Sequence, residues 1–281
     1  MCIALVNFDI DTMYHYCSLD SFFSIVKNQE LWLTRADYTN DIYEMQYVDH
    51  KMLEIANEML ENGEITEEAS RDLKMFYNRE DYYGKMFIGC FSRQGENLSQ
   101  WRLYADDAKG VSIGFNVAQL IRKNCIRPDL SILMSGYVGY KVKYFDKAMK
   151  EEIKEDLRDN VRENANYDIT IKDFIRFKEN DYIKGDEFKF EEEYRILYNP
   201  AQKQIGNYRF DVGNDFYRQG DMDFRVRDNK LVPYWKMPIG GAISEVIIGS
   251  KCSASETEMK NFLMKYGFSE AVVRRSELSY R

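Results

Sequence analysis

The chain has 281 residues, of which 44% are hydrophobic and 31% are charged, and it contains only 4 prolines. This composition supports a substantial folded core and excludes a fibrous or a disordered chain. The formal net charge of −8 argues against general affinity for nucleic-acid backbones, which depends on neutralising phosphates, although it leaves a local basic groove open. No apolar run approaches the roughly 20 residues that cross a bilayer, and we expect no secretory signal, because the start carries aspartates and no basic region.

Strand and helix patterns alternate in the first part of the chain. A short β-like run, MYHYCS (13–18), precedes apolar residues at helical spacing, with Ser18 as the predicted helix cap. ELWLTRA (30–36) returns to strand character, and a longer amphipathic helix follows. Between them, Asn40 and Asp41 stand in a turn, where they either cap the helix or supply acceptors at the mouth of a cleft.

The middle and the end of the chain are rich in strands. Alternating patterns predict strands in KMFIGCFS (85–92), GVSIGFN (110–116) and YVGYKVKYF (137–145). A charged helical insertion at about 146–185 follows, and later come a hairpin pattern, FRVRDNKLVPYW, and a last helix capped by Ser255. Clustered strands, with helices mainly at the ends and in one insertion, predict a single α+β domain over residues 1–281.

Three consecutive glutamates stand directly before an apolar strand in EEEYRILYN (191–199). If the whole stretch is extended, alternation places the apolar side chains of YRILY on the core face and Glu191, Glu193 and Arg195 on the other. Arg195 would then fix one carboxylate and leave the second to accept a proton or to stabilise positive charge. The alternative, which the spacing alone favours, is a solvated face with a surface ion pair worth about 0 to 1 kcal/mol.

Aromatic side chains supply the other candidate site residues. Trp101 and Tyr104 lie three residues apart on an expected helical turn. Exposed, they would stack on a planar ring such as nicotinamide or a base, whereas the commoner alternative is that they close the end of a sheet. His15, flanked by tyrosines in the first strand, is either a satisfied core histidine or a donor to a ligand hydroxyl.

The numbers of cysteines and histidines indicate the cellular compartment and the metal binding to expect. The five cysteines are odd in number and widely scattered, which predicts reduced thiols in a cytoplasmic protein. Only two histidines are present, so we expect no zinc site built from histidines and no bound metal.

Several segments in order resemble the bacterial family called domain of unknown function 2971. They are YHYCSLDSFFSIVKNQELWLT with NDIYE behind it, CFSRQGENLSQWRLYADDAKGVSIGF, FKFEEEYRIL and the closing ISEVIIGS…SELSYR. The resemblance runs over nearly the whole chain, and its name implies no activity.

The chain also resembles, more loosely, the ADP-ribosyltransferase superfamily, which is built on a split, mostly antiparallel β core flanked by helices. In that superfamily a histidine or arginine lies on the first strand, a serine or aromatic on a middle strand, and a glutamate, often in Glu-x-Glu, on a late strand. The resemblance gives these roles to His15, Ser92 and Glu193, with Glu191 as the partner of Glu193. It implies an NAD-dependent ADP-ribosyltransferase or NAD glycohydrolase, acting as a toxin or phage-defence effector.

The mechanism implied by this resemblance is the loss of nicotinamide from NAD through an oxocarbenium-like transition state. Glu193 would hold the ribose hydroxyls and stabilise the developing charge, and His15 would anchor a ribose hydroxyl. The predicted NAD-binding residues are Tyr16, Ser92, Trp101, Tyr104, Arg195, Asn40 and Asp41. The acceptor would be an unidentified protein or nucleic acid, and no membrane partner is expected.

Two other function classes stay open. Oxygen ligands at Asp41, Glu44, Glu191 and Glu193 suit Mg²⁺ or Mn²⁺, as in a metal-dependent phosphodiesterase or nuclease. Alternatively, the aromatic residues and the acidic face dock a partner protein or a nucleotide without catalysis.

Overall fold

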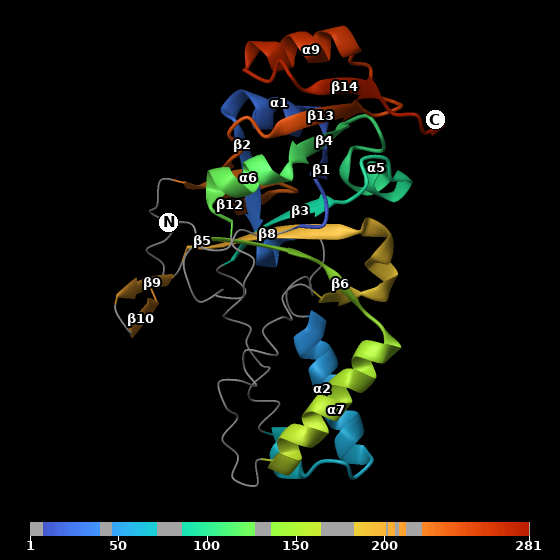
Figure 1. The fold of residues 1–281 in the computed structure, drawn as a ribbon, viewed down its shortest axis with the longest axis vertical. Coiled ribbons are helices and arrows are strands. Elements are labelled where there is room, and N and C mark those ends of the chain that lie inside the picture. The colour runs from blue at the N-terminus through green and yellow to red at the C-terminus, as the bar shows by residue number, and fades with distance from the viewer. Residues whose placement is uncertain are drawn as a thin grey trace. The chain divides into compact units, whose positions relative to one another are not determined.

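The computed structural model describes residues 8–39, 47–71, 86–126, 136–163, 183–200, 202–205, 208–211 and 221–280. The chain groups into two compact units (Figure 1). The sheet unit comprises residues 1–35, 86–141 and 190–281, and the helical unit comprises residues 36–85 and 142–189.

A large sheet, mostly antiparallel, forms the sheet unit. Within the described residues its strands run in the order β11-β12-β2-β3-β1-β4-β13-β14, with β8 and then β5 added at β3, and β13–β14 is its parallel pair. The strands are β1 (Thr12–Cys17), β2 (Glu30–Arg35), β3 (Phe87–Ser92), β4 (Val111–Asn116), β5 (Gly136–Lys141), β8 (Glu193–Asn199), β11 (Met222–Arg227), β12 (Lys230–Pro238), β13 (Ile243–Ile248) and β14 (Val272–Arg275). With helices packed around this sheet, the predicted α+β class is confirmed.

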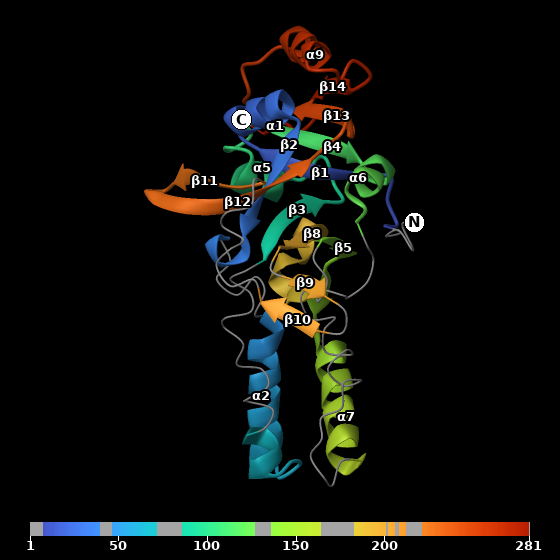
Figure 2. The ribbon, with the colours of Figure 1, turned by 90° about the vertical axis from the view of Figure 1, so that its left-hand side faces the viewer.

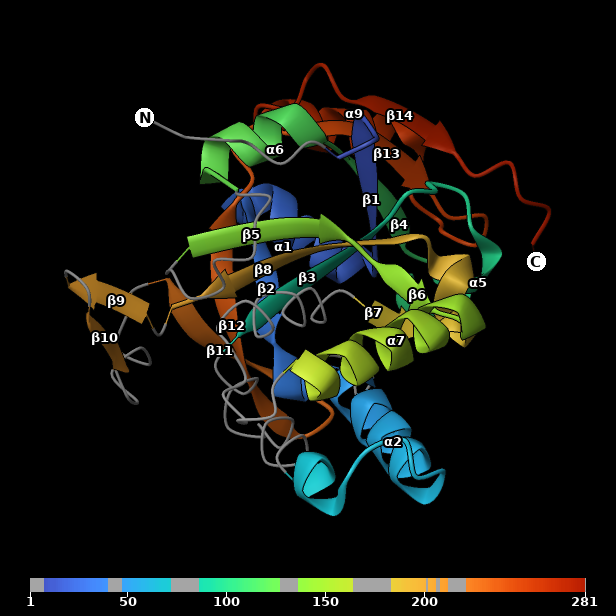
Figure 3. The same ribbon diagram turned by 60° about the horizontal axis from the view of Figure 1, so that its bottom comes forward.

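The sheet branches at β3. One edge of β3 pairs with β8 from Phe87 to Ser92, and Figure 3 shows β5, β8 and β3 side by side. The other edge pairs with β2 at Phe87 and Ile88 but with β1 at Ser92. Strands β1 and β2 therefore share one edge of β3 in succession, and they diverge between these two points.

Four helices belong to the described part of the sheet unit, and their caps follow from local sequence. They are α1 (Leu19–Asn28), α5 (Leu98–Tyr104), α6 (Val117–Asn124) and α9 (Glu256–Lys265). Ser18 caps α1 by accepting from the Ser21 N–H, and Ser255 forms a capping box with Glu258. Both caps were predicted from the sequence. Figure 1 shows α9 and β14 beside β13 at the upper end of this unit.

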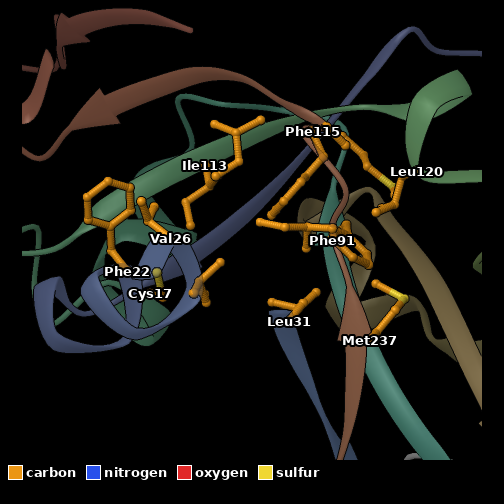
Figure 4. Packing of buried hydrophobic residues seen from close by; sticks show 14 of the residues in the cluster. Cys17, Phe22, Val26, Leu31, Phe91, Ile113, Phe115, Leu120 and Met237 are labelled. Atoms are coloured by element: carbon orange, nitrogen blue, oxygen red, sulfur yellow. The ribbon is translucent and has the colours of Figure 1, made fainter. Parts of the chain in front are cut away.

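The main core lies between α1, α6, α9 and one face of the sheet (Figure 4). Phe91, Ile113 and Phe115 contribute to it from the central strands, and each is at most 2% exposed. Burying one such side chain contributes about 1.5–3 kcal/mol. A second, smaller cluster contains Tyr16, Trp101, Ala105, Ala108 and Ile247.

The turn after α5 has an unusual backbone. Asp106, Asp107 and Ala108 all have positive φ, at 49°, 54° and 66°, although such conformations are unfavourable for residues other than glycine. Tertiary contacts hold the turn: Asp107 accepts from Lys251 Nζ at 2.7 Å and from the hydroxyl of Tyr280 at 2.5 Å. The C-terminal segment is thereby fixed to the end of α5.

Two hairpins complete the described sheet unit. The β11–β12 turn has Asp228 and Asn229 at φ 50° and 60°, the left-handed pair that a two-residue type I′ turn requires, so the predicted hairpin is confirmed. Strands β9 (Gln202–Ile205) and β10 (Tyr208–Asp211) pair separately.

Ion pairs join the two long helices of the helical unit. Its described elements include η1 (Ala36–Tyr38), α2 (Tyr47–Glu61), β6 (Lys143–Phe145), α7 (Lys147–Glu163) and β7 (Ile183–Gly185), and η3 (Asp186–Glu191) then leads into β8. Figure 2 shows α2 and α7 side by side, and Lys154 Nζ lies 2.6 Å from the Glu58 carboxylate between them. None of the helices in the described ranges is both long and apolar enough to span a membrane.

Candidate functional site

The three strands that carry the predicted motif residues are neighbours. Ser92 of β3 pairs with Glu193 of β8 on one side and with Tyr14 of β1 on the other. Directly opposed residues of antiparallel strands share a face, so these three side chains lie on one face of the sheet. His15 follows Tyr14, so alternation directs its side chain to the opposite face. The structure thus brings Ser92 and Glu193 together and places His15 beside them in the backbone but not on their face.

Glu193 and Arg195 form a buried ion pair. Arg195 Nε donates to Glu193 Oε1 at 2.7 Å, and Nη2 donates to Oε2 at 3.2 Å. The side chains are 4% and 0% exposed, so the expectation of a solvated face with a surface ion pair is wrong. Alternation along the strand predicted their common face correctly, but it carries no information on whether that face is covered. A charge shielded from water is tolerated when it is paired in this way, and the guanidinium also fixes the carboxylate's orientation.

Glu191 is not on the strand with Glu193, contrary to the expectation of a fully extended EEEYRILYN. It ends the 3-10 helix η3, and Glu192 has a left-handed φ of 42° that breaks the alternation before β8 begins. Glu191 is 2% exposed, and its Oε1 accepts from the hydroxyl of Tyr104 at 2.9 Å. The Ser92 hydroxyl donates to the backbone carbonyl of Glu191 at 2.8 Å, so Ser92 positions this turn.

The loop before α5 holds the glutamate turn in place, through residues that the sequence did not single out. Gln94 Nε2 donates to Glu192 Oε1 at 2.5 Å, and Asn97 Nδ2 donates to the carbonyl of Phe190 at 2.7 Å. Asn97 also caps α5 by accepting from the Ser99 N–H at 3.0 Å. An asparagine directly before a helix is a recognisable cap signal, whereas its contact with Phe190 has no signal in the sequence.

Tyr16 and Trp101 are packing residues of the second cluster. Their rings meet edge to face with centroids 5.1 Å apart, and they are 5% and 1% exposed. The Tyr16 hydroxyl donates to the Gln94 carbonyl at 2.7 Å, and burial raises the pKa of this phenol. The structure therefore agrees with the alternative in which Trp101 closes the end of a sheet, because neither ring presents a free face for stacking. Tyr104, at 38% exposed, is the accessible member of the predicted aromatic pair.

His15 ties β1 to β3. Its Nδ1–H donates to the carbonyl of Cys90 at 3.0 Å, at the point where the edge of β3 passes from β2 to β1, and its ring lies against Phe91. Burial lowers the pKa of His15, which keeps the ring neutral near pH 7. In that tautomer Nε2 is an acceptor, so the expectation that His15 donates to a ligand hydroxyl is wrong.

A second polar cluster, also missed from the sequence, is centred on the carboxylate of Glu96. It accepts from Arg274 Nη1 at 2.9 Å, from the Ser276 hydroxyl at 2.7 Å, from the Glu277 N–H at 3.0 Å and from Trp101 Nε1 at 3.3 Å. Arg274 also donates to Glu245, which accepts the hydroxyl of Tyr14. These contacts fasten the chain after β14 to the loop before α5.

Metal binding finds no support among the described residues, where no three histidine, cysteine or acidic side chains come together. Asn40, Asp41 and Glu44 lie outside the described residues. Their predicted roles, as cleft acceptors or as ligands of Mg²⁺ or Mn²⁺, stay predictions.

The comparisons with known proteins give one match. No curated protein and no solved structure matches the chain. A family model described as a protein of unknown function (DUF2971) matches residues 100–196, about a third of the chain, from α5 into β8. This range includes Trp101, Tyr104 and the Glu193–Arg195 pair. Over residues 100–196 the chain thus matches the DUF2971 family that its sequence was predicted to resemble, while the predicted resemblance over nearly the whole chain stays a prediction.

Proposed function

We propose that the protein is an ADP-ribosyltransferase-like enzyme that consumes NAD, either by transferring ADP-ribose or by hydrolysing NAD. The observation that carries this proposal is the adjacency of β1, β3 and β8, with Tyr14, Ser92 and Glu193 in one row across them. Three segments that are distant in the sequence and resemble the superfamily's motifs thereby become neighbours. A role as a toxin or defence effector in the cytoplasm, with a macromolecular acceptor, belongs to the same proposal.

Glu193 is the proposed catalytic carboxylate. Arg195 donates to both oxygens of the carboxylate, which fixes its orientation. When the bond from ribose C1′ to nicotinamide breaks, positive charge develops on C1′ and the ribose hydroxyls become stronger donors. A hydrogen bond from such a hydroxyl to Glu193 then strengthens in the transition state, which is the condition for catalysis.

Other residues of the site support this step. Nicotinamide leaves with the electron pair of the broken bond, and an acceptor nucleophile or water attacks C1′ and loses a proton. Glu191, whose carboxylate contacts the accessible Tyr104, is the proposed general base for that proton. Through its bond to Cys90, His15 acts as a positioning residue that sets β1 against β3.

Release of nicotinamide from NAD tests the proposal directly. Purified protein is incubated with NAD labelled in the adenylate, with and without a cell extract, and nicotinamide and labelled macromolecules are quantified. We expect release by the wild type and a loss of about 100-fold or more in Glu193→Gln, with Glu270→Gln, an exposed glutamate far along the chain, as matched control. A folded wild-type protein that releases no nicotinamide under either condition would refute the proposal.

A non-catalytic ligand-binding module is the second candidate, and the burial of the Glu193–Arg195 pair favours it. In that case the pair is a structural element. Glu193→Gln then lowers the stability of the protein, while NAD is neither consumed nor required. Calorimetric titration with NAD and a set of nucleotides, combined with the release assay, separates binding without turnover from catalysis.

A further inference from the structure

We infer that the face of the sheet unit formed by Arg225, Trp32, Thr34 and Tyr234 is a binding site for the phosphate or pyrophosphate group of a ligand. This inference is independent of the proposed function, because none of these residues belongs to the glutamate turn or to the motif row. It rests on two unsatisfied donors, on a positive charge with no acid partner among the described residues, and on a tyrosine ring against which both side chains pack.

Two buried donors at this place have no acceptor. Arg225 Nε and Trp32 Nε1 are shielded from solvent and make no hydrogen bond. Buried donors are almost always satisfied in folded proteins, and an exception calls for a missing ligand, ion or water. Here two exceptions occur on strands β11 and β2, which are separated by β12 alone.

The register of the strands brings these donors to one face. Thr34 of β2 pairs with Tyr234 of β12, which pairs with Asp223 of β11. Trp32 and Arg225 each lie one alternation from this row, in opposite directions, so they are on the same face and diagonally across Tyr234 from one another. Arg225 Nη2 donates to Thr34 Oγ1 at 2.7 Å. The guanidinium therefore reaches across β12 toward the strand that carries Trp32.

Tyr234 holds the two donor side chains in position. Its ring stacks on Trp32 with centroids 4.3 Å apart and an interplanar angle of 24°, and the Arg225 guanidinium carbon lies 6.0 Å from its centroid. Trp32 and Arg225 thus pack against the same tyrosine ring.

No acid among the described residues balances the charge of Arg225. Among the described residues no carboxylate lies within ion-pair distance of it, although Asp223 on the same strand face pairs with Lys236 at 2.9 Å. Burial and the neighbouring Arg227 both lower the pKa of Arg225, and its charge in turn lowers the pKa of His15. An anionic ligand would relieve this repulsion.

Phosphate chemistry fits this arrangement. A guanidinium binds phosphate through two or more N–H groups, and the tetrahedral oxygens can accept from donors on different strands. The indole N–H adds one neutral donor. The Arg225, Trp32 and Thr34 side chains are half-buried, so a phosphate group at the end of a larger molecule can approach their exposed parts. It reaches the shielded Arg225 Nε and Trp32 Nε1 when these side chains turn toward it.

Calorimetric titration with pyrophosphate and with inorganic phosphate, at constant ionic strength, tests the inference. We expect saturable binding by the wild type and a loss of about tenfold or more in Arg225→Gln. Arg227→Gln is the matched control, because it removes one charge from the same strand and should retain affinity within about twofold. Trp32→Phe keeps the ring but removes the donor, and should weaken binding by about three- to tenfold.

Two results would overturn the inference. One is the absence of saturable binding of either anion to the folded wild type at millimolar concentration. The other is an equal loss in Arg225→Gln and Arg227→Gln, which would mean that net charge alone attracts the anion. If Arg225→Gln does not fold, Trp32→Phe decides the matter: unchanged affinity contradicts the inference and weakened affinity supports it.

Discussion

The carboxylate of Glu96 offers a sharp test of the contacts that hold the site together. The substitution Glu96→Ala removes the common acceptor of four donors, which come from α5, from β14 and from the chain after β14. We expect a loss of stability without a change in the strand order, because none of the four donors is itself removed.

The magnitude follows from the fate of each donor. Trp101 is 1% exposed, so its indole N–H loses its acceptor where water cannot replace it, at about 1–3 kcal/mol. Arg274 keeps its contact with Glu245 at 2.7 Å and is 36% exposed, so the lost ion pair adds only about 1 kcal/mol or less. The Ser276 hydroxyl and the exposed Glu277 backbone can turn to water. The expected total is about 1–4 kcal/mol.

Urea unfolding followed by tryptophan fluorescence measures this loss as a lower midpoint at an unchanged slope. Glu277→Ala is the control, because Glu277 contacts Glu96 only through its backbone N–H, which the substitution leaves in place. Glu96→Gln keeps an acceptor oxygen and should fall between the two. A loss below about 1 kcal/mol in Glu96→Ala, or an equal loss in Glu277→Ala, would refute the reasoning.

Three further predictions concern charged groups. Because burial lowers the pKa of His15 below its usual 6.5, the unfolded chain binds a proton that the native state refuses, and stability should fall as the pH drops below 6.5. The free energy of unfolding, measured by denaturation across this range, should depend less steeply on pH in His15→Gln than in the control variant His50→Gln, whose histidine is exposed. Hydrogen bonds from a tyrosine and a lysine lower the pKa of Asp9 from 3.8 to about 2, so its contribution is present above pH 3.8 and is lost as the pH falls toward 2. When unfolding is followed on lowering the pH, the Asp9→Asn variant should lack the loss of stability that Asp9 causes in the wild type. An acid-unfolding midpoint equal to that of the wild type would contradict this prediction. Finally, Arg195→Met should cost about 3–5 kcal/mol because it strands a buried carboxylate, whereas adding Glu193→Met should recover part of that loss; a double variant less stable than the single one would show that other contacts of Glu193 outweigh the ion pair.

Local signals in the sequence predicted the secondary structure well. Ser18 and Ser255 cap helices as expected, because a cap depends on hydrogen bonds within one turn. The hairpin of β11 and β12 was predicted from the pattern FRVRDNKLVPYW, and its turn places Asp228 and Asn229, which tolerate it, in the left-handed backbone conformation. The α+β class followed from the clustering of such elements.

The candidate site was less predictable, because it depends on contacts between distant segments. A single left-handed residue, Glu192, removes Glu191 from the strand, and no local pattern distinguishes it from its two glutamate neighbours. Likewise, Glu96 accepts from residues about 180 positions away, which no periodicity can indicate. The donors of Arg225 and Trp32 become notable only when their surroundings show that acceptors are missing.

The branching of the sheet at β3 has a consequence for biosynthesis. As the chain emerges from the ribosome, β3 is made long before β8, because the chain first builds the second part of the helical unit. Until residue 199 has been translated, the backbone N–H and C=O groups on one edge of β3 lack their final partner strand, and closing so large a loop is slow. The nascent polypeptide is therefore most vulnerable to mispairing and to chaperone capture in this interval, and a product truncated before β8 should accumulate as aggregate.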